Sequence, residues 1–249
     1  MKIKYKSAMR FLQISLLFLS ISAFSQNNFT TPFEQGNGNQ STTYEECIAF
    51  YEKLDESFAN IQMIHKGTTD SGKPLYLVLF SNEGKFDFDE YFTKNKAVIL
   101  INNGIHAGEP DGIDATMMLM RDLAMGKIKT AKNTFIAAIP VYSVGGMLNR
   151  NSYSRANQNG PEEYGFRGNA RNYDLNRDFI KSDTKNSKSF QKLFTELNPD
   201  IFLDNHVSNG ADYQYTFTCI ATQHERLGNK LGNYFINELY PSVVKDMNK

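Results

Sequence analysis

Residues 97–124 read AVILINNGIHAGEPDGIDATMMLMRDLA and contain a strand pattern, a loop and a helix pattern in one continuous stretch. The apolar run 97–102 is typical of a strand buried at the centre of a sheet. Pro110 followed by Asp111 is a helix-start signal, and the pattern predicts a helix from Asp111 to about Ala124. A buried strand that passes through a loop into a helix is typical of α/β domains.

Strand and helix patterns also alternate on both sides of this stretch. Thr43, with Glu46 three residues later, predicts the capped start of a helix. The expected helices cover 43–58, 111–124, 187–197 and 223–238, and the expected strands cover 61–64, 74–80, 97–102, 134–139, 201–204 and 213–218. We therefore expect an α/β fold with a mixed central sheet and helices on both faces. Residues 143–182 show little periodicity, and so long an irregular stretch is usually functional.

The composition is that of a soluble globular protein. The 249 residues are 41% hydrophobic and 22% charged, which excludes wholesale disorder and a multi-span membrane protein and suggests one domain or slightly more. Basic and acidic residues number 27 each, so no nucleic-acid partner is expected. Two cysteines, Cys47 and Cys219, allow at most one disulfide, and whether they pair stays open.

The N-terminal residues have the pattern of an export signal. Three lysines and Arg10 precede an apolar run from Phe11 to Phe24, and small residues flank Phe24. The run of about 14 residues is shorter than the roughly 20 that a membrane-spanning helix needs, although an uncleaved anchor is the alternative. We expect a signal peptide at 1–25, a polar leader at 26–42 and a catalytic domain at 43–249. The mature protein would be periplasmic or secreted, with no stable membrane span.

Two histidines and a glutamate lie just past the ends of buried strands, where open α/β sheets place their ligands. His106 and Glu109 follow the strand at 97–102, and His206 follows the strand at 201–204. Two imidazoles and one carboxylate are a ligand set that suits zinc with one position left open. The alternatives are a chance surface pair for the first two and a hydrogen-bonded histidine at the core edge for His206.

A third polar cluster, RGNARNYDLNRDF at 167–179, is rich in arginine and asparagine. An arginine fork beside an asparagine amide can hold a carboxylate through two parallel hydrogen bonds. A second arginine can stabilise the oxyanion that forms when water attacks an amide carbonyl. The alternative is an ordinary salt-bridged loop.

Together these motifs resemble the M14 family of zinc carboxypeptidases. HAGEPDG at 106–112 resembles the family's first metal motif, DLNR at 174–177 its substrate-carboxylate motif, and Asn205-His206 its third metal ligand. GTTDSGKPL at 67–75 resembles its early hairpin. The matching motifs stand in the family's order across residues 43–238, which is more specific than any one of them.

The resemblance implies a zinc carboxypeptidase-like fold and a role for each motif. His106, Glu109 and His206 would bind one zinc ion. Asn176 and Arg177 would grip the terminal carboxylate of the substrate. Arg167 resembles the arginine that helps to polarise the scissile carbonyl in bacterial members, with Arg155 as its rival. The implied activity is hydrolysis of the C-terminal bond of a peptide or cell-wall peptide through metal-activated water.

One departure from the family pattern concerns the general base. The family's catalytic glutamate follows the third metal ligand on a late strand, and a substrate-covering tyrosine lies between them. Neither has a matching position here, since Glu225 and Glu238 fall in an expected helix. We therefore expect these residues to be the N-terminal part of a longer enzyme, with a sheet incomplete on its C-terminal side. The alternatives are a related zinc amidohydrolase or deacylase, and an inactive peptide- or metal-binding module.

Overall fold

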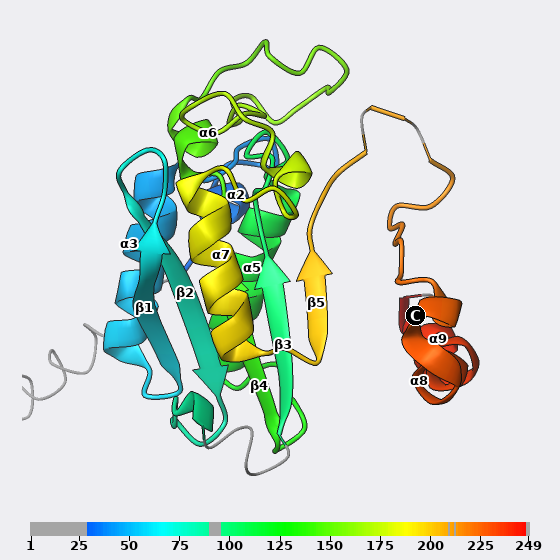
Figure 1. The fold of residues 1–249 in the computed structure, drawn as a ribbon. Helices are drawn as coiled ribbons and strands as arrows, with labels where there is room; N and C mark the ends of the chain where they lie inside the picture. The colour runs from blue at the N-terminus through cyan, green and yellow to red at the C-terminus, as the bar shows by residue number, and fades with distance from the viewer. Residues whose placement is uncertain (1–28, 90–95, 209, 212, 248–249) are drawn as a thin grey trace, which may run out of the picture. The chain divides into compact units, whose positions relative to one another are not determined.

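The computed structural model of the chain describes residues 29–89, 96–208, 210–211 and 213–247 (Figure 1). The signal peptide expected at 1–25 lies outside the described residues. The chain forms two compact units, one ending at Gly210 and the other beginning at Ala211. In the part of the chain that is described, no helix is both long and apolar enough to cross a membrane.

The first unit is built on a mixed five-stranded sheet in the order β1-β2-β4-β3-β5. Its strands are β1 (Ile61–Thr68), β2 (Pro74–Ser81), β3 (Ala97–Asn102), β4 (Thr134–Ile139) and β5 (Ile201–Asp204). β2 pairs antiparallel with β1 and β4, whereas β3 runs parallel to both β4 and β5. The mixed sheet expected from the sequence is confirmed, and the bounds of β3, β4 and β5 are those predicted.

Helices cover both faces of this sheet (Figure 1). Successive β2 residues divide between two cores, because side chains alternate across a strand. Val78 and Phe80 join the core formed with α3 (Tyr44–Ser57) and α5 (Asp111–Ala124). Leu77 and Leu79 join the core formed with α7 (Lys185–Leu197). Burial of each such side chain contributes about 1.5–3 kcal/mol, so both helix layers hold the sheet in place.

The segment before α3 differs from the expected polar leader. In its described part, residues 29–42, Phe29 and Thr31 are buried and α2 (Pro32–Gln35) forms. Thr31 and Glu34 make a capping box, and Glu34 is bonded to Arg121 of α5 at 2.6 Å. Despite its polar composition, this segment therefore forms a capped helical turn that packs on the domain, and the fold begins before residue 43.

The expected irregular stretch at 143–182 contains two short helical pieces, α6 (Val144–Leu148) and the 3-10 turn η1 (Leu175–Arg177). α7 begins at Lys185, two residues before the predicted start, because Thr184 serves as its N-cap and accepts a hydrogen bond from the Ser187 N–H.

The second unit is helical from His224 to Met247. It contains η2 (His224–Leu227), α8 (Gly228–Tyr234), the π-helical turn η3 (Phe235–Leu239) and α9 (Tyr240–Met247). The predicted helix at 223–238 is therefore confirmed and continues further. The strand predicted at 213–218 is wrong, since none forms in the described part of this segment. A segment of alternating apolar and polar residues forms a strand only when a neighbouring strand pairs with it and one of its faces is buried. Here the aromatic side chains of that face are not buried, since Tyr213, Tyr215 and Phe217 are 57%, 68% and 53% exposed.

Candidate metal centre

The parallel pairing of β3 with β5 brings two loops together. Asn102, the last residue of β3, lies opposite Asp204, the last residue of β5. The loop after β3 then carries His106 and Glu109, and the loop after β5 carries His206. Because parallel strands end at the same edge of a sheet, side chains far apart in the sequence meet at this edge.

The three predicted metal ligands form a compact cluster. One ligand atom from each of His106, Glu109 and His206 lies within 4.8 Å of the others. The two imidazole ring centres are 5.2 Å apart. Nδ1 of His106 lies 3.0 Å from one carboxylate oxygen of Glu109, and Nδ1 of His206 lies 2.9 Å from the other oxygen. The structure therefore brings together the ligand set that the sequence singled out.

The outer nitrogen of each imidazole is held by an aspartate. His106 Nε2 donates to Asp174 Oδ1 at 3.0 Å, and His206 Nε2 donates to Asp204 Oδ2 at 3.0 Å. An aspartate that accepts the Nε2 proton leaves Nδ1 as the atom that would bind a cation once it gives up the proton that it donates to Glu109, and such a carboxylate is the usual support of a metal-binding histidine.

Sequence reasoning missed both of these aspartate roles. The available signals were the place of Asp174 in the DLNR motif and the position of Asp204 two residues before His206. Residues at this spacing on an extended chain point to the same side, so their side chains can meet.

Glu109 is a buried carboxylate that remains ionised. Its Oε1 accepts from Arg155 Nη2 at 3.0 Å, and its Oε2 accepts from the Val207 backbone N–H at 3.2 Å. Burial by itself raises the pKa of Glu109, but hydrogen bonds from both histidines and the charge of Arg155 hold it well below its usual range. Two imidazole nitrogens and this carboxylate fit a zinc ion, which favours such N/O sets with further positions open.

The two rival arginines occupy different environments. Arg155 is 7% exposed and is engaged with Glu109. The Arg167 side chain is 41% exposed, and its Nε and Nη2 donate to Asp174 Oδ2 at 3.2 and 3.0 Å. Its Nη1 also lies 3.9 Å from Glu109 Oε1. Arg167 is therefore the arginine that lies beside the cluster and still faces solvent.

Asn176 and Arg177, the predicted carboxylate-binding pair, lie in the turn η1 directly after Asp174. Asp174 Oδ1 accepts the Asn176 backbone N–H at 3.0 Å, which ties this turn to the residue that supports His106. Arg177 is exposed, and its Nη1 donates to the Asn176 carbonyl at 2.9 Å. Among the described residues, no hydrogen bond or ion pair joins either side chain to the three ligands. Of the other histidines, His65 lies on β1 and His224 belongs to the second unit.

Comparisons with known proteins agree with this arrangement. Carboxypeptidase 2 of Trichophyton equinum is 27% identical over 184 residues, which are 71% of this chain and 31% of that protein. Carboxypeptidase A of Helicoverpa armigera superposes with a TM-score of 0.54 at 16% identity, covering 80% of this chain and 53% of that one. A metallo-carboxypeptidase of Burkholderia cenocepacia gives a TM-score of 0.51 at 15% identity, covering 70% and 43%.

The chain thus spans about half the length of these solved structures and less than a third of the curated relatives that it matches. Because the solved structures are only 15–16% identical to this chain, they show that the fold is shared. Membership of a family is shown instead by the match to a family model. The model of the zinc carboxypeptidase family matches residues 47–218, which is more than half of the sequence. The chain belongs to the M14 family of zinc carboxypeptidases.

Proposed function

We propose that this chain carries the metal centre of an exported, zinc-dependent metallocarboxypeptidase that hydrolyses the C-terminal bond of peptides or cell-wall peptides. The observation that supports it is the convergence of His106, Glu109 and His206 at one edge of the sheet in a chain of the M14 family. Export rests on the pattern of residues 1–25. A peptide substrate agrees with the carboxypeptidase names of the relatives.

Three residues would hold the ion, and two aspartates would orient the two histidines among them. His106 and His206 would offer Nδ1, and Glu109 would offer a carboxylate oxygen. When bound, zinc supplies Lewis acidity, which polarises a carbonyl oxygen and lowers the pKa of a water molecule. Asp174 and Asp204 keep the imidazoles in the tautomer that this role needs, because each accepts an Nε2 proton.

Arg167 would act on the scissile carbonyl. Its exposed guanidinium lies beside Glu109, and Asp174 holds two of its nitrogens. That contact fixes the plane of the side chain, so Nη1 is placed to donate a hydrogen bond to an oxygen that gains negative charge.

Asn176 and Arg177 would hold the terminal carboxylate of the substrate. The Arg177 guanidinium is exposed and donates only to a neighbouring backbone carbonyl in the described residues, so most of its donors remain for a ligand. An arginine fork and an amide N–H group match the two oxygens of a carboxylate.

The first test measures bound metal. Wild-type chain is loaded with zinc, dialysed and analysed by mass spectrometry of the metal, beside His106→Ala, His206→Ala and the control His65→Ala. We expect one zinc per chain in the wild type and the control and less than a tenth of that in the two ligand variants. Full zinc occupancy in His106→Ala or His206→Ala would remove that residue from the ligand set.

The second test separates the carboxylate clamp from the metal centre. Binding of one peptide with a free or an amidated C-terminus is measured on zinc-loaded wild type and Arg177→Ala. We expect the free peptide to bind the wild type at least tenfold more tightly than the amidated one, and the preference to vanish in Arg177→Ala. An equal affinity for both peptides in the wild type contradicts the clamp. Hydrolysis of N-acyl amino acids in preference to peptides would replace the carboxypeptidase proposal by the amidohydrolase.

A further inference from the structure

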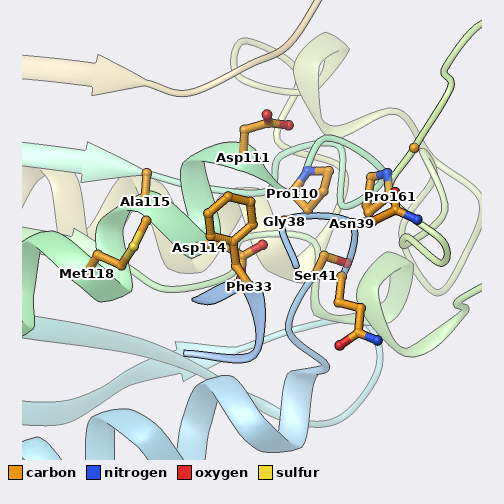
Figure 2. Close-up of a pocket in the computed structure, with 12 residues that line it drawn as sticks. Phe33, Gly38, Asn39, Ser41, Pro110, Asp111, Asp114, Ala115, Met118 and Pro161 are labelled. Atoms are coloured by element: carbon orange, nitrogen blue, oxygen red, sulfur yellow. The ribbon is translucent and has the colours of Figure 1, made fainter. Parts of the chain in front are cut away.

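A cavity of about 400 Å³ lies at the N-terminal end of α5, formed by residues that the metal centre does not use (Figure 2). One wall is the first two turns of α5, and the others are α2, the loop at 38–41 and the Gly160-Pro161 segment. The apolar side chains of the lining are Phe33, Pro110, Ala115, Met118 and Pro161. Two carboxylates, Asp111 and Asp114, also line it (Figure 2).

Asp114 is buried in this wall without an ion pair, although the charge of Arg150 lies near enough to favour its ionised form. Its side chain is 4% exposed, and its Oδ1 accepts one hydrogen bond, from the Thr42 N–H at 3.2 Å. Among the described residues no arginine, lysine or histidine nitrogen pairs with it, and Oδ2 has no partner although it is not sealed from solvent. A buried carboxylate of this kind is rare because buried charges are normally paired.

Two other buried carboxylates show how this chain normally treats such groups. Glu109 is bonded to Arg155 and flanked by two imidazoles. Asp178 accepts from the Thr184 hydroxyl at 2.6 Å and from the Asp183 and Thr184 N–H groups. Asp114, in contrast, accepts one hydrogen bond from a backbone N–H, and the cavity lies where further partners would otherwise stand.

The position of Asp114 in a helix does not account for its burial. Acidic residues are favoured in the first turn of a helix, and this explains the exposed Asp111. An exposed acidic residue already satisfies this preference for the first turn, so the preference does not require a buried carboxylate with a cavity beside it. The cavity and the unpaired oxygen therefore need a separate explanation.

We propose that this cavity binds an organic cation, an alkylammonium or guanidinium group on a short apolar chain. The charged head would contact Oδ2 of Asp114, and the apolar chain would lie against Phe33 and Met118. The Phe33 ring adds attraction for a cation, and Asp111 adds negative charge at the rim. A calcium ion fits poorly, because it takes about six to eight oxygen ligands and five of the lining side chains are apolar. The proposal is independent of the metal centre.

The pKa of Asp114 makes this binding sensitive to pH. Burial raises that pKa to about 7, and the Thr42 N–H opposes the rise. The charged and titratable groups that face Asp114 from neighbouring elements are Asp111 of α5, Glu46, Cys47 and Tyr51 of α3, and Arg150. A cation binds the ionised carboxylate, so its affinity should rise as the pH passes from 6 to 8, with release of a proton at the lower end.

The experiment titrates the full chain with n-butylammonium and, as a neutral isostere, n-butanol, with backbone amide NMR as the readout. We expect butylammonium to shift amides of Phe33, Ser41, Asp114 and Ala115, to bind at least tenfold more tightly than butanol and to bind more tightly at pH 8 than at pH 6. Saturating zinc should leave the affinity unchanged. Two further ligands distinguish the natural source, with blocked lysine methylamide representing a peptide side chain and spermidine representing a free polyamine.

Matched variants identify the carboxylate and the cavity separately. Asp114→Asn keeps an oxygen for the Thr42 N–H and removes the charge, and Ala115→Leu keeps the charge and fills the cavity from an exposed helical position. Each should weaken butylammonium binding at least tenfold, and Asp114→Asn should also abolish the pH dependence. Met125→Leu, at the other end of α5, is the control and should bind as the wild type does.

If Asp114→Asn does not fold, Ala115→Leu decides the question alone. Butylammonium binding no tighter than that of butanol, or wild-type affinity in a folded Ala115→Leu chain, would overturn the proposal.

Discussion

Asp204 is expected to set the zinc affinity of the centre without touching the ion, and Asp204→Asn tests this. The aspartate has two donors to satisfy, since Oδ1 accepts from Asn102 Nδ2 at 2.9 Å and Oδ2 accepts from His206 Nε2 at 3.0 Å. An asparagine has one oxygen, so it cannot accept from both. If its oxygen keeps the bond to Asn102, its NH₂ group faces His206 Nε2.

That change would favour the wrong imidazole tautomer. Once the His206 ring is neutral, Nε2 would be the acceptor and the remaining proton would stay on Nδ1, the atom that faces Glu109 and the proposed ion. Loss of such a supporting carboxylate costs about 10- to 100-fold in metal affinity, which is about 1.4–2.7 kcal/mol. We expect Asp204→Asn to raise the zinc dissociation constant by this factor while the fold stays intact.

The assay is competition for zinc with a chromophoric chelator at fixed pH, together with the ¹⁵N chemical shifts of the His206 ring. The control is Asp183→Asn, which removes an equal charge from an exposed position outside the centre. Wild-type zinc affinity in Asp204→Asn, or a His206 ring whose tautomer is unchanged, would refute the reasoning. A loss of affinity as large in Asp183→Asn would show that net charge is responsible.

Three further predictions concern stability and are checked by denaturant unfolding. Phe29→Ala should lower the free energy of unfolding by about 3–5 kcal/mol, because the residue is 6% exposed and belongs to the core. A loss below about 1 kcal/mol would instead mean that this segment does not contribute to the core, as expected of a polar leader. Arg155→Ala should cost about 3–5 kcal/mol in zinc-free protein, since it leaves Glu109 buried without its arginine, and less when zinc is bound. Hydrogen bonds outweigh burial and lower the pKa of Asp178 to about 2, so its contribution of roughly 2 kcal/mol is present above pH 4 and is lost as the pH falls toward 2; Asp178→Asn should flatten this dependence.

The parts of the fold that the sequence predicted well are those whose pattern is decided locally or by burial on both faces. β3 and β4 are continuous apolar runs because helices cover both of their faces. α3 begins where Thr43 and Glu46 cap each other, as expected. The failures are segments whose state depends on distant partners. Residues 213–218 alternate like a strand but have no strand beside them in the described residues, and Phe29 packs against rings that the sequence does not place near it.

The candidate site could be predicted in its ligands but not in its supports. His106, Glu109 and His206 stand out because histidines are rare in this chain and each lies past a buried strand. Asp204 stands out less, because an acidic residue at a strand end is usually a solvated one, and its spacing from His206 is the one signal of a contact. Its role follows from the β3–β5 register, which sets Asn102 opposite it and leaves its second oxygen to His206. The sequence also left Arg155 and Arg167 as rivals, and exposure is what distinguishes them.

Glu109 connects these observations, because three loops meet on one carboxylate. Its oxygens take the imidazoles of His106 and His206, the guanidinium of Arg155 and the backbone N–H of Val207. Arg155 balances the charge of Glu109 from the protein itself, so that charge does not depend on a bound cation for compensation. The two cores that flank the sheet are likewise built from side chains outside the centre. The domain should therefore stay folded when zinc is removed. Small zinc domains differ, because their folding is driven by the binding free energy of the metal and they unfold without it.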